Sequence, residues 1–184
     1  MEESKKILLA TSNEGKLKEF KKLFTKFDLV YQTELGINDA IEDGLTFFEN
    51  ALKKARHGAK ESGLYTIADD SGLVVPGLNF EPGIYSARYA GEGASDNDNR
   101  NKIIEELKKR NLESLPAYYV CILVGIHSEN DPMPIYASGK IHGKIRTISE
   151  GDGGFGYDKI FYPNDSQTSM ASIAPELKNT ISHR

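Results

Sequence analysis

The fold of this chain is indicated by residues 7–20, which read ILLATSNEGKLKEF. The apolar run Ile7 to Ala10 comes first and is typical of a buried strand. After a polar turn, Leu17 and Phe20 begin an apolar face at helical spacing that continues to Phe27, with lysine and glutamate between them. A strand that turns into an amphipathic helix is the repeating step of an α/β fold.

The same step recurs downstream of this segment. Leu29–Thr33 is expected to be a second strand. Thr46 and Glu49 match a capping box, and the apolar spacing behind them predicts a helix that Gly63 ends. Tyr65–Ala68 is then predicted to be a third strand.

Hairpin signals dominate the second half of the chain. Ser95 is placed to cap a third helix, and Tyr118–Ile126 is strongly β-forming. Ser128–Pro132 turns the chain, and Ile135–Ile141 returns as the second strand of a hairpin. Asp152–Pro163 is glycine-rich and then aromatic. The order of elements predicts a mixed α/β sheet with flanking helices and an added antiparallel lobe, and a cleft between the two lobes would be the natural ligand site.

Composition limits the class of protein. The chain has 184 residues, of which 39% are hydrophobic, and its net charge is −4. This length predicts a single domain over residues 1–184 that folds without a metal or disulfide. The hydrophobic content excludes wholesale disorder, and the charge excludes binding of duplex DNA through bulk positive charge, so we expect no nucleic-acid partner.

The sequence also bears on location. No apolar run approaches the ~20 residues of a membrane span. The first residues, MEESKK, contain two acids and do not fit a signal peptide. Cys121 is the only cysteine, and its apolar neighbours predict a buried, inert thiol. We therefore expect a cytoplasmic protein with no membrane partner.

The first candidate for chemistry is the turn between the first strand and the first helix. It consists of Thr11, Ser12, Asn13, Glu14, Gly15 and Lys16. A helix N-terminus offers free N–H groups to phosphate, and Lys16 adds a positive charge. An ordinary helix cap with a solvated lysine would account for the same residues.

Acidic residues form the second candidate. Asp69-Asp70-Ser71-Gly72 follows the third predicted strand, where a carboxylate could hold Mg²⁺ or activate water. An acidic turn is the alternative. Glu42 could supply a second carboxylate or belong to a solvated loop. Lys53 shares a helix face with Glu49 and Arg56, so it is either part of a surface salt-bridge stripe or a phosphate contact.

The third candidate is the glycine-rich segment Gly153–Asp158. Glycines on both sides of Phe155 would free its ring to stack on a nucleic base, whereas a ring packed in the core is the alternative. Lys178 and Ser182-His183-Arg184 are uninformative when taken alone.

Taken in order, these motifs resemble a known family. The motifs are Thr11-x-Asn13-x-x-Lys16, Phe47-x-Glu49-Asn50-Ala51-x-x-Lys54-Ala55, Ala68-Asp69-Asp70-Ser71-Gly72-Leu73, Pro82-Gly83-Ile84-Tyr85-Ser86-Ala87-Arg88, Gly154-Phe155-Gly156-Tyr157-Asp158 and Ser182-His183-Arg184. Together they cover nearly the whole chain and resemble the inosine/xanthosine triphosphate pyrophosphatase family, also called XTP/dITP diphosphatases. Each motif is weak alone, but six in one order are specific.

The resemblance implies a fold and an activity. Members have an elongated mixed α/β fold, an ITPase-like fold with two lobes around a central cleft, and are typically homodimers. They use Mg²⁺ to hydrolyse deaminated purine nucleoside triphosphates, such as ITP, dITP and XTP, to the monophosphate and pyrophosphate. The enzyme implied is a nucleoside triphosphate pyrophosphatase that cleanses the nucleotide pool.

The resemblance also implies site residues. The triphosphate would be held by Thr11, Ser12, Asn13, Glu14, Gly15, Lys16 and Lys53. Asp70 would be the metal-linked proton acceptor, Glu42 the second metal ligand, and Ser71 a substrate contact. The nucleoside would be framed by Phe155, Gly156, Tyr157 and Asp158, and the base edge would be reached by Lys178, His183 and Arg184.

Two alternatives accompany this hypothesis. The chain could be a related house-cleaning pyrophosphatase for pyrimidine or modified nucleotides, or a nucleotide sensor without turnover. In addition, family members normally continue past Ser-His-Arg with a helix. This sequence ends at Arg184, so we expect that helix to be lacking and base specificity to be affected.

Overall fold

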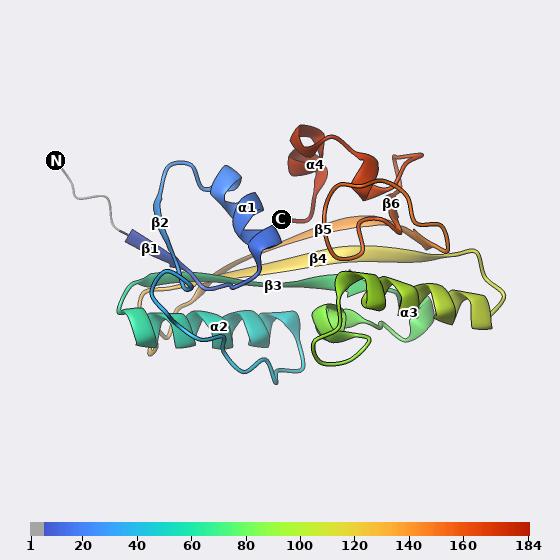
Figure 1. Ribbon diagram of the computed structural model, residues 1–184. Helices are drawn as coiled ribbons and strands as arrows, with labels where there is room; N and C mark the ends of the chain where they lie inside the picture. Colours follow the sequence, from blue (N-terminus) through green and yellow to red (C-terminus); the bar gives the residue numbers. More distant parts are fainter. Residues whose placement is uncertain (1–5) are drawn as a thin grey trace. The chain divides into compact units, whose positions relative to one another are not determined.

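The computed structural model describes residues 6–184 (Figure 1). Most of the first residues, which do not fit a signal peptide, lie outside the described residues. The chain divides into two compact units. Unit 1 comprises the residues up to Asp70 together with Cys121–Ser138, and unit 2 comprises Ser71–Val120 and Gly139–Arg184.

A mixed sheet runs through the described residues in the order β2-β1-β3-β4-β5-β6. Its strands are β1 Lys6–Leu9, β2 Asp28–Tyr31, β3 Tyr65–Val74, β4 Ser114–Ile126, β5 Ile135–Arg146 and β6 Phe161–Pro163. β1 pairs in parallel with β2 and β3, whereas β6 is antiparallel to β5. The predicted mixed α/β sheet with flanking helices is confirmed, and the predicted hairpin strands β4 and β5 are neighbours.

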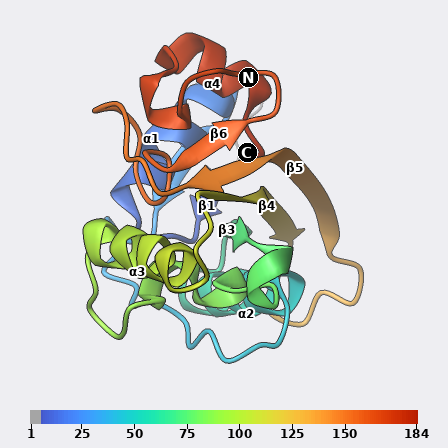
Figure 2. The same ribbon diagram turned by 90° about the vertical axis from the view of Figure 1, so that its right-hand side faces the viewer.

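In unit 1 the helices α1 Glu14–Leu23 and α2 Phe47–Ser62 lie on opposite faces of the sheet (Figures 1 and 2). This follows from topology, because β2 and β3 flank β1 on opposite sides and parallel crossovers are right-handed. The small apolar face of α2 packs on β1, and a Cβ at Gly58 would lie 2.8 Å from the Leu8 side chain. Gly58 therefore sets how closely α2 approaches the strands.

The ends of α2 agree with the sequence. Thr46 accepts a hydrogen bond from the Glu49 N–H, and Gly63 ends the helix in the left-handed conformation with φ of 68°. The Glu49 carboxylate accepts from the Leu45 N–H at 2.7 Å, so it caps the helix one residue earlier than in the standard box. The expectation that the apolar face of α1 continues in helix to Phe27 is wrong, because α1 ends at Leu23. Phe27 lies beyond the helix and is 54% exposed.

In unit 2 the helices α3 Asp96–Lys109 and α4 Pro175–Ile181 lie on opposite faces of the strands (Figures 1 and 2). Short 3₁₀ segments, η1 Pro76–Leu78, η2 Gly83–Arg88 and η3 Met170–Ser172, connect the elements. Ser95 caps α3 as predicted, in a reciprocal capping box with Asp98. The core of unit 2 includes Leu73, Ile103, Leu107, Tyr157 and Phe161.

The third strand differs from the sequence prediction. Asp69-Asp70-Ser71-Gly72 lies inside β3 and does not follow its end, since the strand continues to Val74. The buried Leu73 and Val74 explain the extension, because the chain returns to the core directly after the polar residues. Cys121 is buried as predicted. None of the helices in residues 6–184 is long and apolar enough to cross a membrane.

Candidate functional site

Unit 1 gathers carboxylates and ammonium groups into one buried cluster. We name it the acid–lysine cluster, and it consists of Lys16, Glu42, Lys54, Asp69 and Asp70. The Lys16 ammonium lies 2.9 Å from Oδ2 of Asp69, whose side chain is fully buried. The Lys54 ammonium lies 2.9 Å from Oε1 of Glu42, and the Lys54 side chain is only 11% exposed. Charges held this far from water interact strongly and respond to any ligand charge that arrives.

Asp70 is the member with the most useful protonation equilibrium. Burial raises its pKa to about 6, while the positive charges of Lys54 and Lys16 act in the opposite direction. The negative charge of Glu42 adds to the increase. A carboxylate with a pKa near neutrality can accept a proton from water and still release it.

Lys54 shows the reverse balance. Burial lowers its pKa, but the carboxylates of Asp69, Glu42 and Asp70 outweigh burial and raise the pKa above its usual value. Lys54 therefore stays positively charged at neutral pH. It compensates the acids in the absence of ligand.

The segment that carries Glu42 is fixed by α2. Asn50 on α2 is fully buried, and its Oδ1 accepts a hydrogen bond from the Gly44 N–H at 2.8 Å. A Cβ at Gly44 would lie 2.7 Å from that same oxygen, so a glycine is required for this approach. The Asn50 side chain also lowers the pKa of Asp70. One buried amide thus serves both the Glu42 segment and Asp70.

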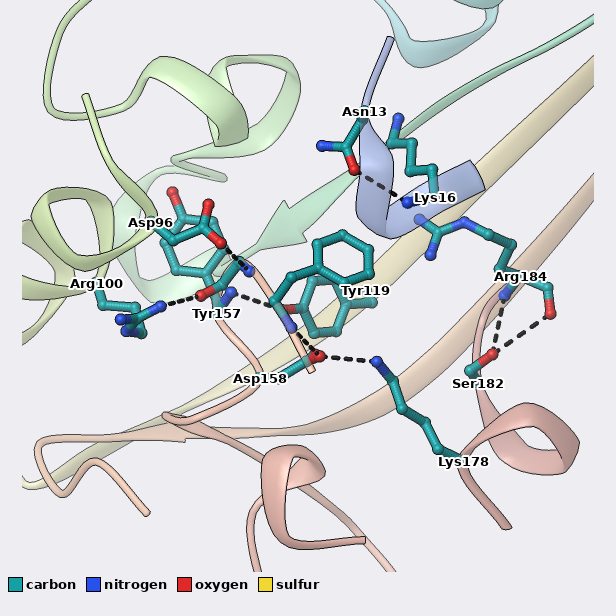
Figure 3. Close-up of polar contacts among 12 residues, drawn as sticks. Asn13, Lys16, Asp96, Arg100, Tyr119, Tyr157, Asp158, Lys178, Ser182 and Arg184 are labelled. Carbon is teal, nitrogen blue, oxygen red and sulfur yellow. Dashed lines mark hydrogen bonds and ion pairs between the residues drawn. The ribbon is translucent and has the colours of Figure 1, made fainter. Parts of the chain in front are cut away.

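The turn before α1 acts as a helix cap and is tied to a neighbouring loop. Asn13 accepts from the Lys16 N–H at 3.0 Å (Figure 3), so the cap interpretation of Asn13 is confirmed. Thr11 is buried and accepts from the Asn13 N–H at 3.3 Å. Ser12 donates to Asp39 at 2.8 Å. Lys16 is not a solvated lysine, because it pairs with Asp69. Of the six predicted residues, Ser12, Asn13 and Glu14 are exposed.

Lys53, which the sequence analysis assigned to the triphosphate, lies outside the acid–lysine cluster. Its side chain is 45% exposed and pairs with the exposed Asp43. The salt bridge observed joins Lys53 to Asp43, a residue outside the predicted stripe of Glu49, Lys53 and Arg56. The neighbouring Lys54 takes the buried place. Helical spacing could have indicated the buried place of Lys54, because it lies four residues after the buried Asn50 and three after the buried Ala51, on the same face of the helix.

The cluster fits a divalent cation by its donor chemistry. Carboxylate oxygens are the ligands of Mg²⁺, which typically takes one or two carboxylates and completes its shell with water and substrate phosphate. The negative charge of Glu42 raises the pKa of Asp70, as expected for two carboxylates near enough to share one ion. Within residues 6–184, no group of three or more His, Cys, Asp or Glu side chains is placed to hold a metal by itself. A site completed by phosphate oxygens agrees with both observations.

Unit 2 carries a second group of predicted residues around Asp158. We name it the aromatic–cation cluster, and it consists of Tyr119, Phe155, Asp158, Lys178, His183 and Arg184. Oδ2 of the buried Asp158 accepts from the Phe155 N–H at 3.0 Å and from the Lys178 ammonium at 2.8 Å (Figure 3). A Cβ at Gly154 would lie 2.1 Å from that oxygen, so the turn requires glycine there.

Two cationic side chains lie near the ring of Phe155. The Lys178 ammonium lies 5.2 Å and the Arg184 guanidinium carbon 5.6 Å from its centroid. The ring is only partly buried and does not belong to the core of unit 2, so packing in the core does not explain it. An aromatic face beside two cations is suited to an electron-rich planar group.

The last residues are placed against β4 and β5. The His183 ring stacks on Tyr119 at 4.7 Å with an interplanar angle of 9°, and Arg184 donates to Ser71 at 3.1 Å. A Cβ at Gly139 would lie only 2.2 Å from the His183 carbonyl oxygen, so glycine is required for this close approach. Burial raises the pKa of Tyr119 well above its usual value, and its hydroxyl accepts from the Tyr157 N–H at 3.1 Å.

The structure thus places eight of the seventeen predicted residues in one of the two clusters, each within one unit. Lys16, Glu42 and Asp70 meet in unit 1, whereas the Phe155 segment, Lys178, His183, Arg184 and Ser71 meet in unit 2. Sequence reasoning assigned no role to Lys54, Asn50 and Tyr119. Lys54 and Asn50 stand in the motif Phe47–Ala55, but nothing in the β-forming stretch around Tyr119 distinguished it.

Comparison with known proteins gives consistent matches. The sequence model of the Ham1 family matches residues 7–184. A dITP/XTP pyrophosphatase of Legionella pneumophila (strain Paris) is 47% identical over 180 residues, which cover 98% of this chain and 93% of that protein. A dITP/XTP pyrophosphatase of Vibrio cholerae serotype O1 is 48% identical over 182 residues, covering 98% of this chain and 91% of that protein.

Solved structures agree with these matches. A HAM1 protein from Coxiella burnetii has a TM-score of 0.89 and 41% identity, and the match covers 98% of this chain and 92% of that chain. A nucleoside-triphosphatase / dITP/XTP pyrophosphatase from Mycobacterium abscessus has a TM-score of 0.76 and 34% identity, covering 96% of this chain and 93% of that chain.

Proposed function

The chain belongs to the Ham1 family, and from that premise we propose that it hydrolyses deaminated purine nucleoside triphosphates to the monophosphate and pyrophosphate. The substrates proposed are ITP, dITP and XTP. The names of the relatives, dITP/XTP pyrophosphatases, support this substrate class, and the resemblance found in the sequence is confirmed by the family match. The observation that carries the proposal is the acid–lysine cluster with Asp70 at its centre.

The proposed reaction is attack of water on the α-phosphorus, with pyrophosphate as the leaving group. Lys16 and Lys54, together with Mg²⁺, would offset the roughly four negative charges of a triphosphate. Asp70, with its pKa of about 6, would accept the proton of the attacking water. Asn50 and Gly44 would keep Glu42 and Asp70 in place during the step.

We propose Mg²⁺ as the cofactor, with Glu42 and Asp70 as its protein ligands. When bound, the ion would neutralise charge on the phosphate oxygens. The Glu42–Lys54 ion pair would then loosen, because both groups would have new partners of opposite charge. This leaves Lys54 available to the phosphates.

The aromatic–cation cluster would select the base. Hypoxanthine and xanthine carry a keto oxygen at C6, whereas adenine carries an amino group there. Lys178 and Arg184 are donors only, so adenine would leave buried donors unpaired, at about 1–3 kcal/mol each. Phe155 would stack on the base, and stacking contributes about 1–3 kcal/mol.

The test is an end-point assay with Mg²⁺ and, in turn, ITP, XTP, GTP and ATP, in which pyrophosphate is separated from phosphate. We expect pyrophosphate and IMP from ITP, with ATP nearly untouched. Faster turnover of dUTP, dTTP or CTP would favour a pyrimidine or modified-nucleotide pyrophosphatase. Tight binding of ITP without pyrophosphate release would favour a nucleotide sensor.

Two further expectations belong with the proposed function. The homodimer that the resemblance implies stays a prediction, as does the cytoplasmic location. Both suit an enzyme that acts on free nucleotides.

A further inference from the structure

Two side chains of α3 hydrogen-bond to one residue, Gly156, in the loop that carries Phe155. Oδ2 of Asp96 accepts from the Gly156 N–H at 2.7 Å, and Nη1 of Arg100 donates to the Gly156 carbonyl at 2.7 Å (Figure 3). Both polar groups of this backbone unit are therefore held by one helix. Hydrogen bonds to charged groups are about twice as strong as neutral ones.

The two side chains that bind Gly156 stand on a part of α3 that is held in place at both ends. Asp96 and Arg100 are four residues apart, so they lie on the same face of α3, one turn from each other. The reciprocal capping box of Ser95 and Asp98 fixes the start of the helix. Ile103 is fully buried in the core of unit 2 and fixes the next turn. The helix face that meets Gly156 is thus anchored at both ends.

The glycines on both sides of Phe155 make the conformation of the loop depend on its hydrogen bonds. Gly154 and Gly156 both have positive φ, of 70° and 59°. Glycine loses more conformational entropy on ordering than any other residue, so bonds within the loop and bonds from α3 both matter here. Phe155 lies between these two glycines, and its ring direction depends on the peptide planes on either side. One plane is held by the bond from the Phe155 N–H to Asp158. The other is held on two sides, since its Gly156 N–H donates to Asp96 of α3 and its Phe155 carbonyl accepts from the Asp158 N–H at 3.2 Å.

We propose that Asp96 and Arg100 are positioning residues: by hydrogen-bonding to the backbone of Gly156, they keep the Phe155 ring in the orientation that stacks on a purine base. This rests on the proposed function, which assigns Phe155 to the base. Without these two hydrogen bonds, the ring occupies the stacking orientation for only a fraction of the time. The apparent dissociation constant for a ligand with a purine base then rises by the inverse of that fraction. Binding of a ligand that has phosphates but no base is unaffected.

The experiment compares two ligands on the same variants. Affinities for IMP and for inorganic pyrophosphate are measured by calorimetry with Mg²⁺ for the wild type, Asp96→Ala and Arg100→Ala. We expect the dissociation constant for IMP to rise about tenfold, within the range that loss of stacking allows. The constant for pyrophosphate should stay within about twofold.

Matched variants separate positioning from folding. Arg110→Ala removes a 2.9 Å bond from the other end of α3 to the Gly77 carbonyl without touching Gly156. It should lower the melting temperature yet keep IMP affinity. Asp96→Asn keeps an acceptor for the Gly156 N–H, and Arg100→Lys keeps a donor for the Gly156 carbonyl. Both variants should therefore recover most of the affinity that the alanine variants lose.

The proposal is overturned by any of three results. These are unchanged IMP affinity in Asp96→Ala and Arg100→Ala, an equal loss of IMP and pyrophosphate affinity, or no detectable IMP binding by the wild type. Failure of the proposed function looks different, because the wild type would then release no pyrophosphate from ITP. The comparison of IMP affinity between the wild type and the two alanine variants would still decide whether Asp96 and Arg100 position the ring.

Discussion

Asp70 combines burial with a carboxylate that the chemistry needs ionised. Asp70→Asn keeps the shape but cannot accept a proton, so we expect kcat for ITP to fall by about 10²–10⁴-fold. The pyrophosphate assay measures this. A rate equal to that of the wild type would remove Asp70 from the proposed mechanism.

The same substitution should stabilise the protein at neutral pH in EDTA. The pKa of Asp70 is raised from 3.8 to about 6, so the folded state holds this proton over a pH range in which the unfolded chain has lost it. Stability therefore falls as pH rises through this window, and the loss is complete above about pH 6. Asp70→Asn removes it, so at about pH 8 the free energy of unfolding should rise by up to about 3 kcal/mol.

Urea unfolding at several pH values tests this expectation. The advantage of Asp70→Asn should shrink as pH falls and vanish near about pH 4, where the wild-type carboxyl is neutral. An advantage that did not depend on pH would mean that burial of this charge is not the cause.

Lys53 and Lys54 form a natural pair of test and control. Lys54→Ala would leave Glu42 and Asp70 with less compensating charge, and breaking a buried ion pair destabilises by about 3–5 kcal/mol. It should also raise KM for ITP, because Lys54 is proposed to bind phosphate. Lys53→Ala removes an exposed pair with Asp43 and should change neither property. Equal effects in the two variants would contradict the placement of Lys54.

These adjacent lysines show what a sequence leaves open at the residue scale. The motif Phe47–Ala55 located the functional helix, and helical spacing was enough to place Lys54 beside the buried Asn50. The partners of Lys54 were not readable, because Glu42 and Asp70 reach it from segments far away along the chain.

At the scale of elements, β5 must pass under the last residues without a side chain at Gly139. In Gly139→Ala the new Cβ would meet the His183 carbonyl at 2.2 Å and displace His183 and Arg184. We expect the affinity for IMP to fall about tenfold and the preference for ITP over ATP to narrow. Ser138→Ala, at an exposed neighbour in the same strand, is the matched control. Unchanged selectivity in Gly139→Ala would separate the last residues from base recognition.

Elements whose ends have local causes were predicted, and those with distant causes were not. α2 begins and ends where Thr46 and Gly63 require it, and α3 begins at Ser95. β3 was predicted to end at its acidic residues because Asp and Gly favour turns. It continues past Ile67, where its pairing with β1 ends, because β4 lies beside it in the sheet and Leu73 is buried in the core, which a single sequence does not reveal.

For the whole molecule, the predicted assembly is open to a direct measurement. One chain has a mass of 20.4 kDa, so light scattering on the eluting protein should give about twice this value. Unit 1 carries large exposed apolar side chains, including Leu45 at 84% and Met133 at 80%, which an interface between copies would cover. A mass of one chain at assay concentrations would contradict the homodimer.

Neither unit is a continuous stretch of the gene. The backbone leaves unit 1 after Asp70, re-enters it after Val120 and leaves it again after Ser138, so β3, β4 and β5 each serve both units. No single crossover between two related genes can exchange one whole unit and leave the other intact. A crossover between Asp70 and Tyr119 would separate the residues proposed for phosphate chemistry from those proposed for base choice, but it would leave unit 1 with segments from two parents. Such an exchange can therefore succeed only where the packing inside each unit tolerates both parental sequences.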